Sequence, residues 1–272
     1  MNLTSSKNSF AQGWLWFKQS LGLLRSERRI SIHVFLYAFS FLALSLVGTY
    51  FSIAWAPVIH LAVVPLMGYF YCRLYERVAL GNPHEQPLVA RLRTQMGSFL
   101  LMGFAFAVFS LLNSLAIKTL PTDGPIVQAI AVALGALLAW ILSLIMNIVV
   151  WLMAVKASTP SNALSMSLTA IVSHLRSLVS NALCLMLVLF PSVVLVLLLL
   201  AVRLLALQNA SLFGGAQTTS LIFSLLTLLT SLATLFSFLM LLALNVFSTF
   251  VICRDLFDAA PEAALENPSP LT

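Results

Sequence analysis

The sequence predicts an all-α polytopic membrane protein, a bundle of six transmembrane helices with short interfacial amphipathic helices. Two observations carry this prediction. Of the 272 residues, 61% are hydrophobic and only 8% are charged, and the apolar residues are grouped in six long runs. A soluble domain carries roughly a quarter charged residues. Because so few charges cannot cover a surface in water, we expect lipid to surround most of the chain.

The six runs have the length of membrane spans. A transmembrane helix needs about 20 mostly apolar residues, and such runs occur at about 30–54, 57–76, 97–117, 126–155, 177–206 and 219–252. A β-barrel would show alternating segments of about ten residues, and none occurs. We therefore expect residues 1–258 to form a single membrane domain. Residues 259–272, which are acidic and contain prolines, are expected to form a disordered tail.

Lys and Arg residues predict the orientation, because loops rich in them stay in the cytoplasm. Only Lys118 and Arg203 lie on one side of the predicted spans. Twelve lie on the other side: Lys7, Lys18, Arg25, Arg28, Arg29, Arg73, Arg77, Arg91, Arg93, Lys156, Arg176 and Arg254. Both termini are therefore predicted to be cytoplasmic. Since these residues flank apolar runs, the net charge of +6 indicates membrane lipids and not nucleic acid as the partner.

A shorter segment with helical periodicity precedes each odd-numbered span. Its apolar residues form one line in each case: Phe10, Trp14, Phe17, Leu21 and Leu24; Leu88, Val89, Leu92 and Met96; Leu164, Leu168, Ile171 and Leu175. Such lines are typical of helices that lie in the membrane interface with the apolar side toward lipid. Arg25, Arg93 and Arg176, at the ends of these segments, are then expected to contact lipid headgroups.

These segments also indicate a threefold internal repeat. They end alike, in Leu24-Arg25-Ser26, Leu92-Arg93-Thr94 and Leu175-Arg176-Ser177. The even-numbered spans each end on a basic residue, Arg73, Lys156 or Arg254. The predicted units, at about 10–80, 87–157 and 161–256, each contain one interfacial helix and two spans.

No arrangement of residues predicts catalysis, a metal site or a cofactor. The sequence lacks the nucleophile-elbow, zinc-protease and phosphate-loop motifs. Its three cysteines have no CxxC spacing, and none of its eight acidic residues falls in the middle of a predicted span. His33 and His60 are predicted at opposite membrane faces and cannot share a metal. We therefore expect a protein that is not an enzyme.

Polar residues within the spans are more informative. Asn147, Asn181 and Asn245 are all predicted in the cytoplasmic halves of their spans. Buried amides in lipid need partners, so these residues form either a layer that packs helices together or a polar cavity open to the cytoplasm. The sixth span carries hydroxyls at helical spacing, which predict a central packing seam: Ser220, Ser224, Thr227, Ser231 and Thr234, continued on the same line by Asn245 and Ser248.

The opening Ala11-Gln-Gly-Trp14 and the closing Cys253-Arg-Asp-Leu-Phe257 resemble a family of bacterial six-span inner-membrane proteins of uncharacterised function. The resemblance implies the membrane fold and a bacterial inner membrane, and it carries no active site, substrate or cofactor. Two functions stay open. One is a non-enzymatic accessory protein or scaffold that interacts with lipids or another membrane protein. The alternative is a small permease with a cytoplasm-facing cavity lined by Asn147, Asn181 and Asn245.

Overall fold

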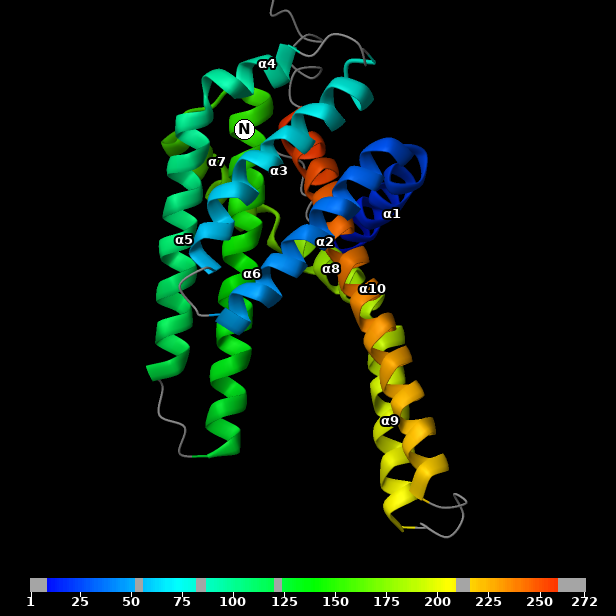
Figure 1. Cartoon of the computed structure of the whole chain (residues 1–272). Coiled ribbons are helices and arrows are strands. Elements are labelled where there is room, and N and C mark those ends of the chain that lie inside the picture. The colour runs from blue at the N-terminus through cyan, green and yellow to red at the C-terminus, as the bar shows by residue number, and fades with distance from the viewer. Residues whose placement is uncertain (1–8, 52–55, 82–86, 120–123, 209–215, 259–272) are drawn as a thin grey trace, which may run out of the picture.

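A computed structural model describes residues 9–51, 56–81, 87–119, 124–208 and 216–258. These residues form helices and no strand (Figure 1), so the all-α prediction is confirmed for them. The elements are α1 (Phe10–Ser26), α2 (Arg28–Phe51), α3 (Ala56–Val78), α4 (Pro87–Thr94), α5 (Met96–Thr119), α6 (Pro125–Lys156), α7 (Pro160–Ser173), α8 (Leu175–Met186), the 3-10 turn η3 (Leu187–Leu189), α9 (Phe190–Gln208) and α10 (Ala216–Phe257). The N-terminal segment 1–8 and the predicted tail 259–272 lie outside the described residues.

Three helical stretches within the described residues are long and apolar enough to cross a membrane. They are Leu137–Lys156, Leu175–Leu199 and Ser224–Phe257. A fourth is added if α4 and α5, which meet at a bend of 71°, count as one broken span. The chain is therefore a helical protein with several helices suited to a bilayer.

Local sequence explains where several helices begin and end. The Ser9 side chain accepts a hydrogen bond from the Gln12 N–H (3.3 Å) and caps the start of α1. Pro160 occupies the first turn of α7, where its missing N–H costs nothing. Pro191 follows the 3-10 turn η3 that separates α8 from α9, because proline disfavours a regular helix through the preceding residues.

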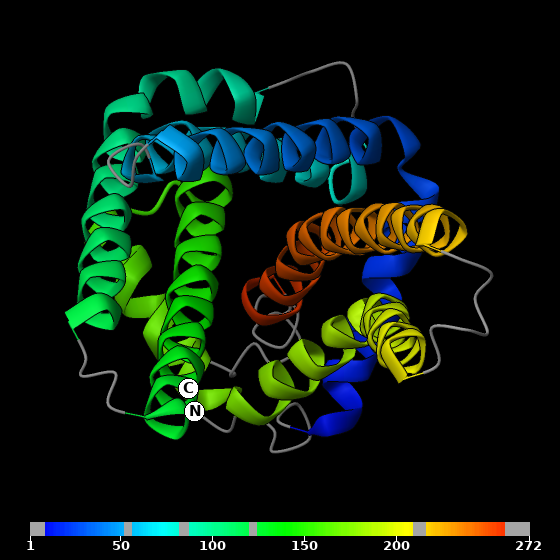
Figure 2. The ribbon, with the colours of Figure 1, turned by 60° about the horizontal axis from the view of Figure 1, so that its bottom comes forward.

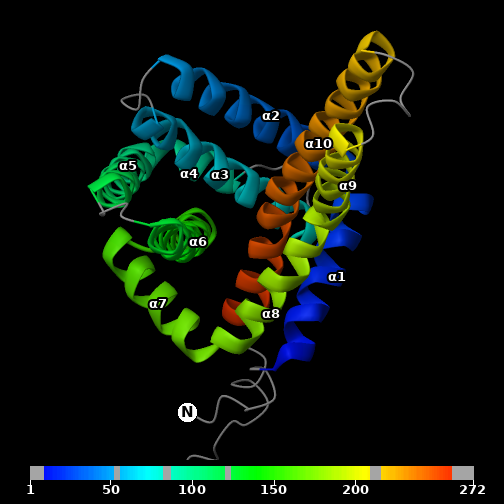
Figure 3. The same cartoon turned by 90° about the horizontal axis from the view of Figure 1, so that it is seen from below.

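Two long hairpins, α5–α6 and α9–α10, diverge from the end of the molecule where α1 and α4 lie (Figure 1). We call this the basic end, because α3, α6 and α10 finish there near Arg77, Lys156 and Arg254. Turned by 60°, the molecule shows α2 (blue) along one edge, crosswise to α6 (green), with α10 (orange to red) beside it (Figure 2). From below, α3, α6 and α10 lie around the middle, with α2, α5 and α9 farther out (Figure 3).

The hydrophobic core lies near the basic end. Every residue from 147 to 155 on α6 and from 246 to 253 on α10 is buried. Farther along the two hairpins, large apolar side chains such as Leu134, Leu232 and Phe236 are exposed. An exposed apolar surface of this extent is expected where lipid, and not water, surrounds the helices.

Helix α1 packs against α8 and α10, which corrects the predicted lipid-facing line. Phe17 and Leu24 of that line are buried, and Trp16, which was not assigned to it, is fully buried. Phe10 and Trp14 remain exposed. Gly13 allows this packing, because a Cβ at this position would stand 2.6 Å from the backbone nitrogen of Asn181 on α8.

The exposed and buried residues of α7 agree better with the prediction than those of α1 do. It buries its small residues Ala163, Ser167 and Ala170, and it contacts α6. Leu164, Leu168 and Leu175 are exposed, as expected of an apolar face turned toward lipid.

The predicted packing seam on α10 is confirmed at Ser248, which is buried and accepts a hydrogen bond from Asn181 of α8, but its first part is wrong for the residues whose side chains the structure describes. Ser224, Thr227, Ser231 and Thr234 are exposed, and Ser220 lies outside those residues. The hydroxyls buried in this part of α10 belong instead to Thr230 and Ser237. Ser237 shares a 2.7 Å hydrogen bond with Ser192 of α9. The sequence pattern identified a line of hydroxyls correctly but assigned its first part, before Asn245, to the wrong face of the helix.

Candidate functional site

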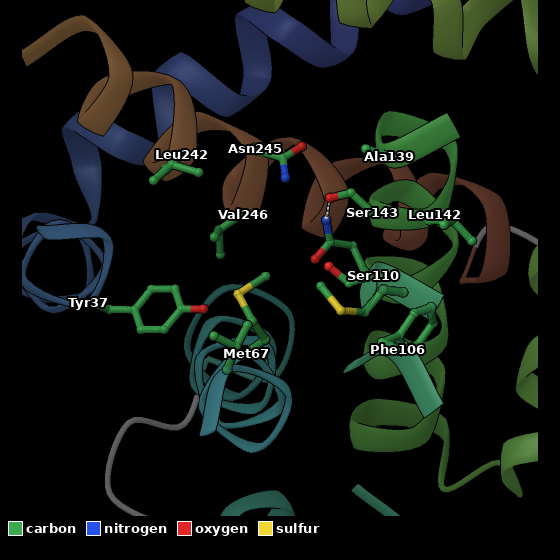
Figure 4. A pocket seen from close by; sticks show the side chains of 13 residues that line it. Tyr37, Met67, Phe106, Ser110, Ala139, Leu142, Ser143, Leu242, Asn245 and Val246 are labelled. Atoms are coloured by element: carbon green, nitrogen blue, oxygen red, sulfur yellow. Dashed lines mark hydrogen bonds between the residues drawn. The ribbon is translucent and has the colours of Figure 1, made fainter. Parts of the chain in front are cut away.

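A cavity of about 220 Å³ lies where α2, α3, α5, α6 and α10 meet (Figure 4). It lies among α3, α6 and α10, which also contact one another. Its lining residues are Tyr37, Val63, Met67, Phe106, Ser110, Ala139, Leu142, Ser143, Met146, Asn147, Leu242, Asn245 and Val246.

The cavity is mostly apolar, and the polar groups that its described residues contribute carry no charge. Of the described residues that line it, none is Asp, Glu, Lys, Arg or His. Its hydrogen-bonding groups are the amides of Asn147 and Asn245 and the hydroxyls of Ser110, Ser143 and Tyr37. Figure 4 shows Tyr37, Ser143 and Asn245 converging on it from three different helices. Such a set can donate and accept hydrogen bonds but cannot neutralise an ion.

The amide of Asn147 is incompletely satisfied. Its side chain is 2% exposed, and its Nδ2 donates a hydrogen bond to Ser143 Oγ (3.5 Å). Its Oδ1 is buried and has no hydrogen-bond partner among the described residues. A buried unpaired acceptor costs about 1–3 kcal/mol, so Asn147 Oδ1 would be stabilised by a donor that the described residues do not supply.

A packed layer closes the cavity toward the basic end. Val34, Tyr71, Phe99, Trp151 and Phe250 are all fully buried in one hydrophobic cluster. Each lies on its helix between the cavity-lining residues and the basic end. A solute from that side would have to pass this layer.

The opposite side of the cavity leads to exposed apolar surface. Beyond the lining residues of α5 and α6, Leu112, Leu137 and Leu138 are exposed. On α10, Phe238 lies one helical turn before the lining residue Leu242 and is partly exposed. Access from this side is therefore through an apolar environment, which suits a molecule dissolved in the bilayer.

The structure brings together two of the three predicted amides. Asn147 and Asn245 both line the cavity. Asn181 of α8 is buried elsewhere, where its Nδ2 donates to Ser248 Oγ on α10 (2.8 Å). Each of the two interpretations therefore applies to some of the amides. Asn181 holds helices together, whereas Asn147 and Asn245 share a cavity.

Arg25, Arg93 and Arg176 are exposed at the ends of α1 and α4 and at the start of α8. Their predicted contacts with lipid headgroups stay a prediction. The neighbouring Arg91 contacts protein instead. Its Nη2 donates hydrogen bonds to the carbonyls of Ala154 (3.0 Å) and Val155 (2.7 Å). It therefore caps the last turn of α6.

Sequence reasoning missed a contact between the two ends of the chain. Asp255 Oδ2 accepts hydrogen bonds from Gln12 Nε2 (2.9 Å) and Trp16 Nε1 (3.0 Å). Gln12 belongs to the opening motif and Asp255 to the closing motif of the family resemblance. Their shared presence in those motifs was the only signal that could have linked them.

Among the described residues, no group of three or more His, Cys, Asp or Glu side chains could hold a metal ion. Comparisons with protein-family models, curated proteins and solved structures find no match to this chain. The cavity and the arrangement of the helices around it are therefore the features that indicate a function.

Proposed function

We propose that the chain is a six-span protein of a bacterial inner membrane with both termini in the cytoplasm. The spans would be α2, α3, α5, α6, the α8–α9 segment and α10. The lengths of α2 and α3, 24 and 23 residues, support this count. The orientation is supported by the sequence, in which twelve Lys and Arg residues flank the predicted spans on one side.

Three contacts support the threefold repeat. The element order short, long, long occurs three times, if α8, η3 and α9 count as one long segment. The short helices α1, α4 and α7 contact α10, α3 and α6, respectively. Each short helix thus meets the last helix of a different unit, and these three last helices meet one another. A ring of three related units would produce this pattern.

We infer that the protein binds an uncharged lipid with a hydroxyl-bearing head, such as a monoglycosyl diacylglycerol, and acts by binding and not by catalysis. The side chain of Asn147 carries this inference, because it lines the cavity and its buried Oδ1 has no hydrogen-bond donor among the described residues. An O–H of the ligand would supply that donor. A charged head would be disfavoured, since none of the described residues that line the cavity carries a counter-charge and burying an unpaired ion costs on the order of several kcal/mol.

The size of the cavity fits the head of such a lipid and not the whole molecule. Pockets that enclose drug-sized ligands measure roughly 300–1,000 Å³, whereas this cavity measures about 220 Å³. At about 30 Å³ per water, it has room for roughly seven waters, or one sugar ring. The acyl chains would lie outside, along the exposed apolar faces of α5, α6 and α10.

The permease is the second candidate, and the shared cavity of Asn147 and Asn245 favours it. It requires the packed layer at the basic end to open. Cysteine at Ser143 separates the two functions. A membrane-impermeant maleimide applied from the cytoplasm should leave Ser143→Cys unmodified if the ligand comes from lipid, and should modify it if the permease is correct.

A photolabelling experiment tests lipid binding. The protein is placed in nanodiscs with monoglucosyl diacylglycerol that carries a diazirine near its head, and labelled peptides are located by mass spectrometry. We expect labelling near Met67 or Met146, which line the cavity, and a decrease of at least fivefold in Asn147→Leu. Asn181→Leu is the matched control, because its amide lies outside the cavity.

Competitors identify the source of the sugar. Excess unlabelled glycolipid should abolish labelling, while free glucose and anionic phosphatidylglycerol should not. Labelling that persists in Asn147→Leu, or equal competition by phosphatidylglycerol, would contradict the proposal. Competition by free glucose would indicate a soluble sugar as the ligand.

A further inference from the structure

We infer that the corner between α1 and α2 binds an anionic phospholipid, whose phosphate lies on a cluster of exposed cations. This cationic cluster consists of Lys18, Arg25, Arg28 and Arg29, and all four side chains are exposed. The site is separate from the cavity of the proposed function, because none of these residues lines that cavity. It would bind a charged lipid where the cavity would bind an uncharged one.

The end of α1 and the start of α2 bring the four cations together. Helix α1 ends at Ser26 and α2 begins at Arg28, so the Cα atoms of Arg25 and Arg29 are at most about 15 Å apart. Lys18 and Arg25 are separated by two helical turns, about 10 Å, and have nearly the same rotational position on α1. The cluster is therefore continuous around the corner.

No acidic side chain of the described residues neutralises the cationic cluster. The structure describes four acidic residues, and each has a partner elsewhere. Asp255 accepts hydrogen bonds from Gln12 and Trp16. The other three form ion pairs: Glu27 with Arg77, Glu76 with Arg73, and Asp258 with Lys156. The positive charge of the cluster is therefore left for an anionic partner from outside these residues.

The start of α2 adds to this demand for an anion. Cations are disfavoured at the N-terminus of a helix, where the helix dipole is positive and backbone N–H groups lack partners within the helix. Arg28 and Arg29 nevertheless occupy the first two positions of α2. A phosphate there would accept hydrogen bonds from the guanidinium groups, which match its geometry, and would compensate the dipole as well.

An exposed apolar line on α2 identifies a lipid as the source of the phosphate. Ile32, Leu36 and Phe39 are exposed, and with Arg28 they lie within a sector of about 80° on the helix. The line from Arg28 to Phe39 is about 16 Å long, close to the depth of one leaflet of a hydrocarbon layer about 30 Å thick. A phospholipid would place its phosphate on the cluster and an acyl chain along this line, whereas a free phosphate ion would not contact the line.

An exposed tryptophan supports this depth in the membrane. Lys18 Nζ lies 5.2 Å from the centre of the Trp14 ring, and Trp14 is exposed on α1. Tryptophan is enriched at the boundary between lipid and water. The cluster is therefore expected at the level of the headgroups.

Two other exposed arginines provide a comparison within the chain. Arg93 and Arg176 are exposed and have no ion pair with a described acidic residue. The nearby Arg91 bonds to carbonyls of α6, and no other Lys or Arg occurs between residues 157 and 202. General attraction to an anionic membrane would involve Arg93 and Arg176 as much as Arg28 and Arg29, but a specific site would not.

The test measures phosphatidylglycerol binding to the full-length protein in detergent micelles by native mass spectrometry, with phosphatidylcholine as the uncharged comparison. We expect saturable binding of phosphatidylglycerol and much weaker binding of phosphatidylcholine. Each basic residue near an anionic lipid surface contributes about fivefold, so the double variant Arg28→Gln, Arg29→Gln should bind roughly 25-fold more weakly. The double variant Arg93→Gln, Arg176→Gln loses the same charge and is the matched control, with little change expected.

Equal weakening by the two double variants, or equal binding of the two lipids by the wild type, would overturn the site. Wild-type binding should also weaken as ammonium acetate is raised from about 0.1 M to about 1 M, since the screening length falls from about 10 Å to about 3 Å. Binding that does not depend on salt would overturn the site even if a variant failed to fold.

A further variant tests the acidic C-terminal residues of the chain as the partner of the cluster. If phosphatidylglycerol binds to Glu262→Gln, Glu266→Gln and not to the wild type, the cluster is covered by these residues and the lipid site is overturned. Photolabelling of the cavity should stay normal in Arg28→Gln, Arg29→Gln, so the cavity and the corner are tested separately.

Discussion

Gly13→Ala tests how α1 is held on the rest of the molecule. The added Cβ would lie 2.6 Å from the Asn181 backbone nitrogen and 2.6 Å from Ser180 Cβ. Since one of these atoms is backbone, the helices themselves must separate. Overpacking of this kind costs typically 1–3 kcal/mol. The hydrogen bonds from Ser177 Oγ to the Ser9 carbonyl (3.0 Å) and from Ser180 Oγ to the Phe10 carbonyl (2.8 Å) would weaken as well, each worth about 1 kcal/mol.

Gly22→Ala on the same helix is the control, because nothing lies within 4 Å of a Cβ at that position. Replacing glycine in a helix by alanine stabilises by roughly 0.5–1 kcal/mol. We therefore expect thermal unfolding in detergent to show a lower midpoint for Gly13→Ala and an equal or higher midpoint for Gly22→Ala. If both variants shift in the same direction by the same amount, the close contact between α1 and α8 is not a feature of the protein.

Two further predictions concern the chain ends and the topology. Asp255→Asn should destabilise the protein by about 1.5–3 kcal/mol, because the charged acceptor for Gln12 and Trp16 is lost. Unfolding followed by Trp fluorescence measures this change, and an unchanged unfolding midpoint would contradict it. Reporter fusions after Lys156 should report the cytoplasm and fusions after Gly214 the outer side, and a cytoplasmic signal at Gly214 would exclude the six-span topology.

The sequence alone was enough to locate most of the helices, although the predicted single run at 177–206 is divided in the structure among α8, η3 and α9. Composition identifies lipid as the solvent, and proline and glycine breaks divide the chain. The predicted run at 97–117 corresponds to α5 (Met96–Thr119), and the predicted run at 126–155 corresponds to α6 (Pro125–Lys156). These assignments depend on local properties, namely the absence of charge over a span and the conformational limits of proline, and such properties need no knowledge of the neighbouring helices.

Only the tertiary structure decided which face of each helix is buried. In water an apolar stripe identifies the buried side, but in lipid both the packed side and the exposed side are apolar. Trp16 is therefore buried and Trp14 exposed on one helix, and the hydroxyls of α10 divide between Thr230 against α9 and Thr234 on the open face. For the same reason the sequence grouped Asn181 with Asn147 and Asn245, although only the latter two share the cavity. Amides at similar depth meet or separate according to helix rotation and tilt, which are set by contacts between helices far apart in the chain.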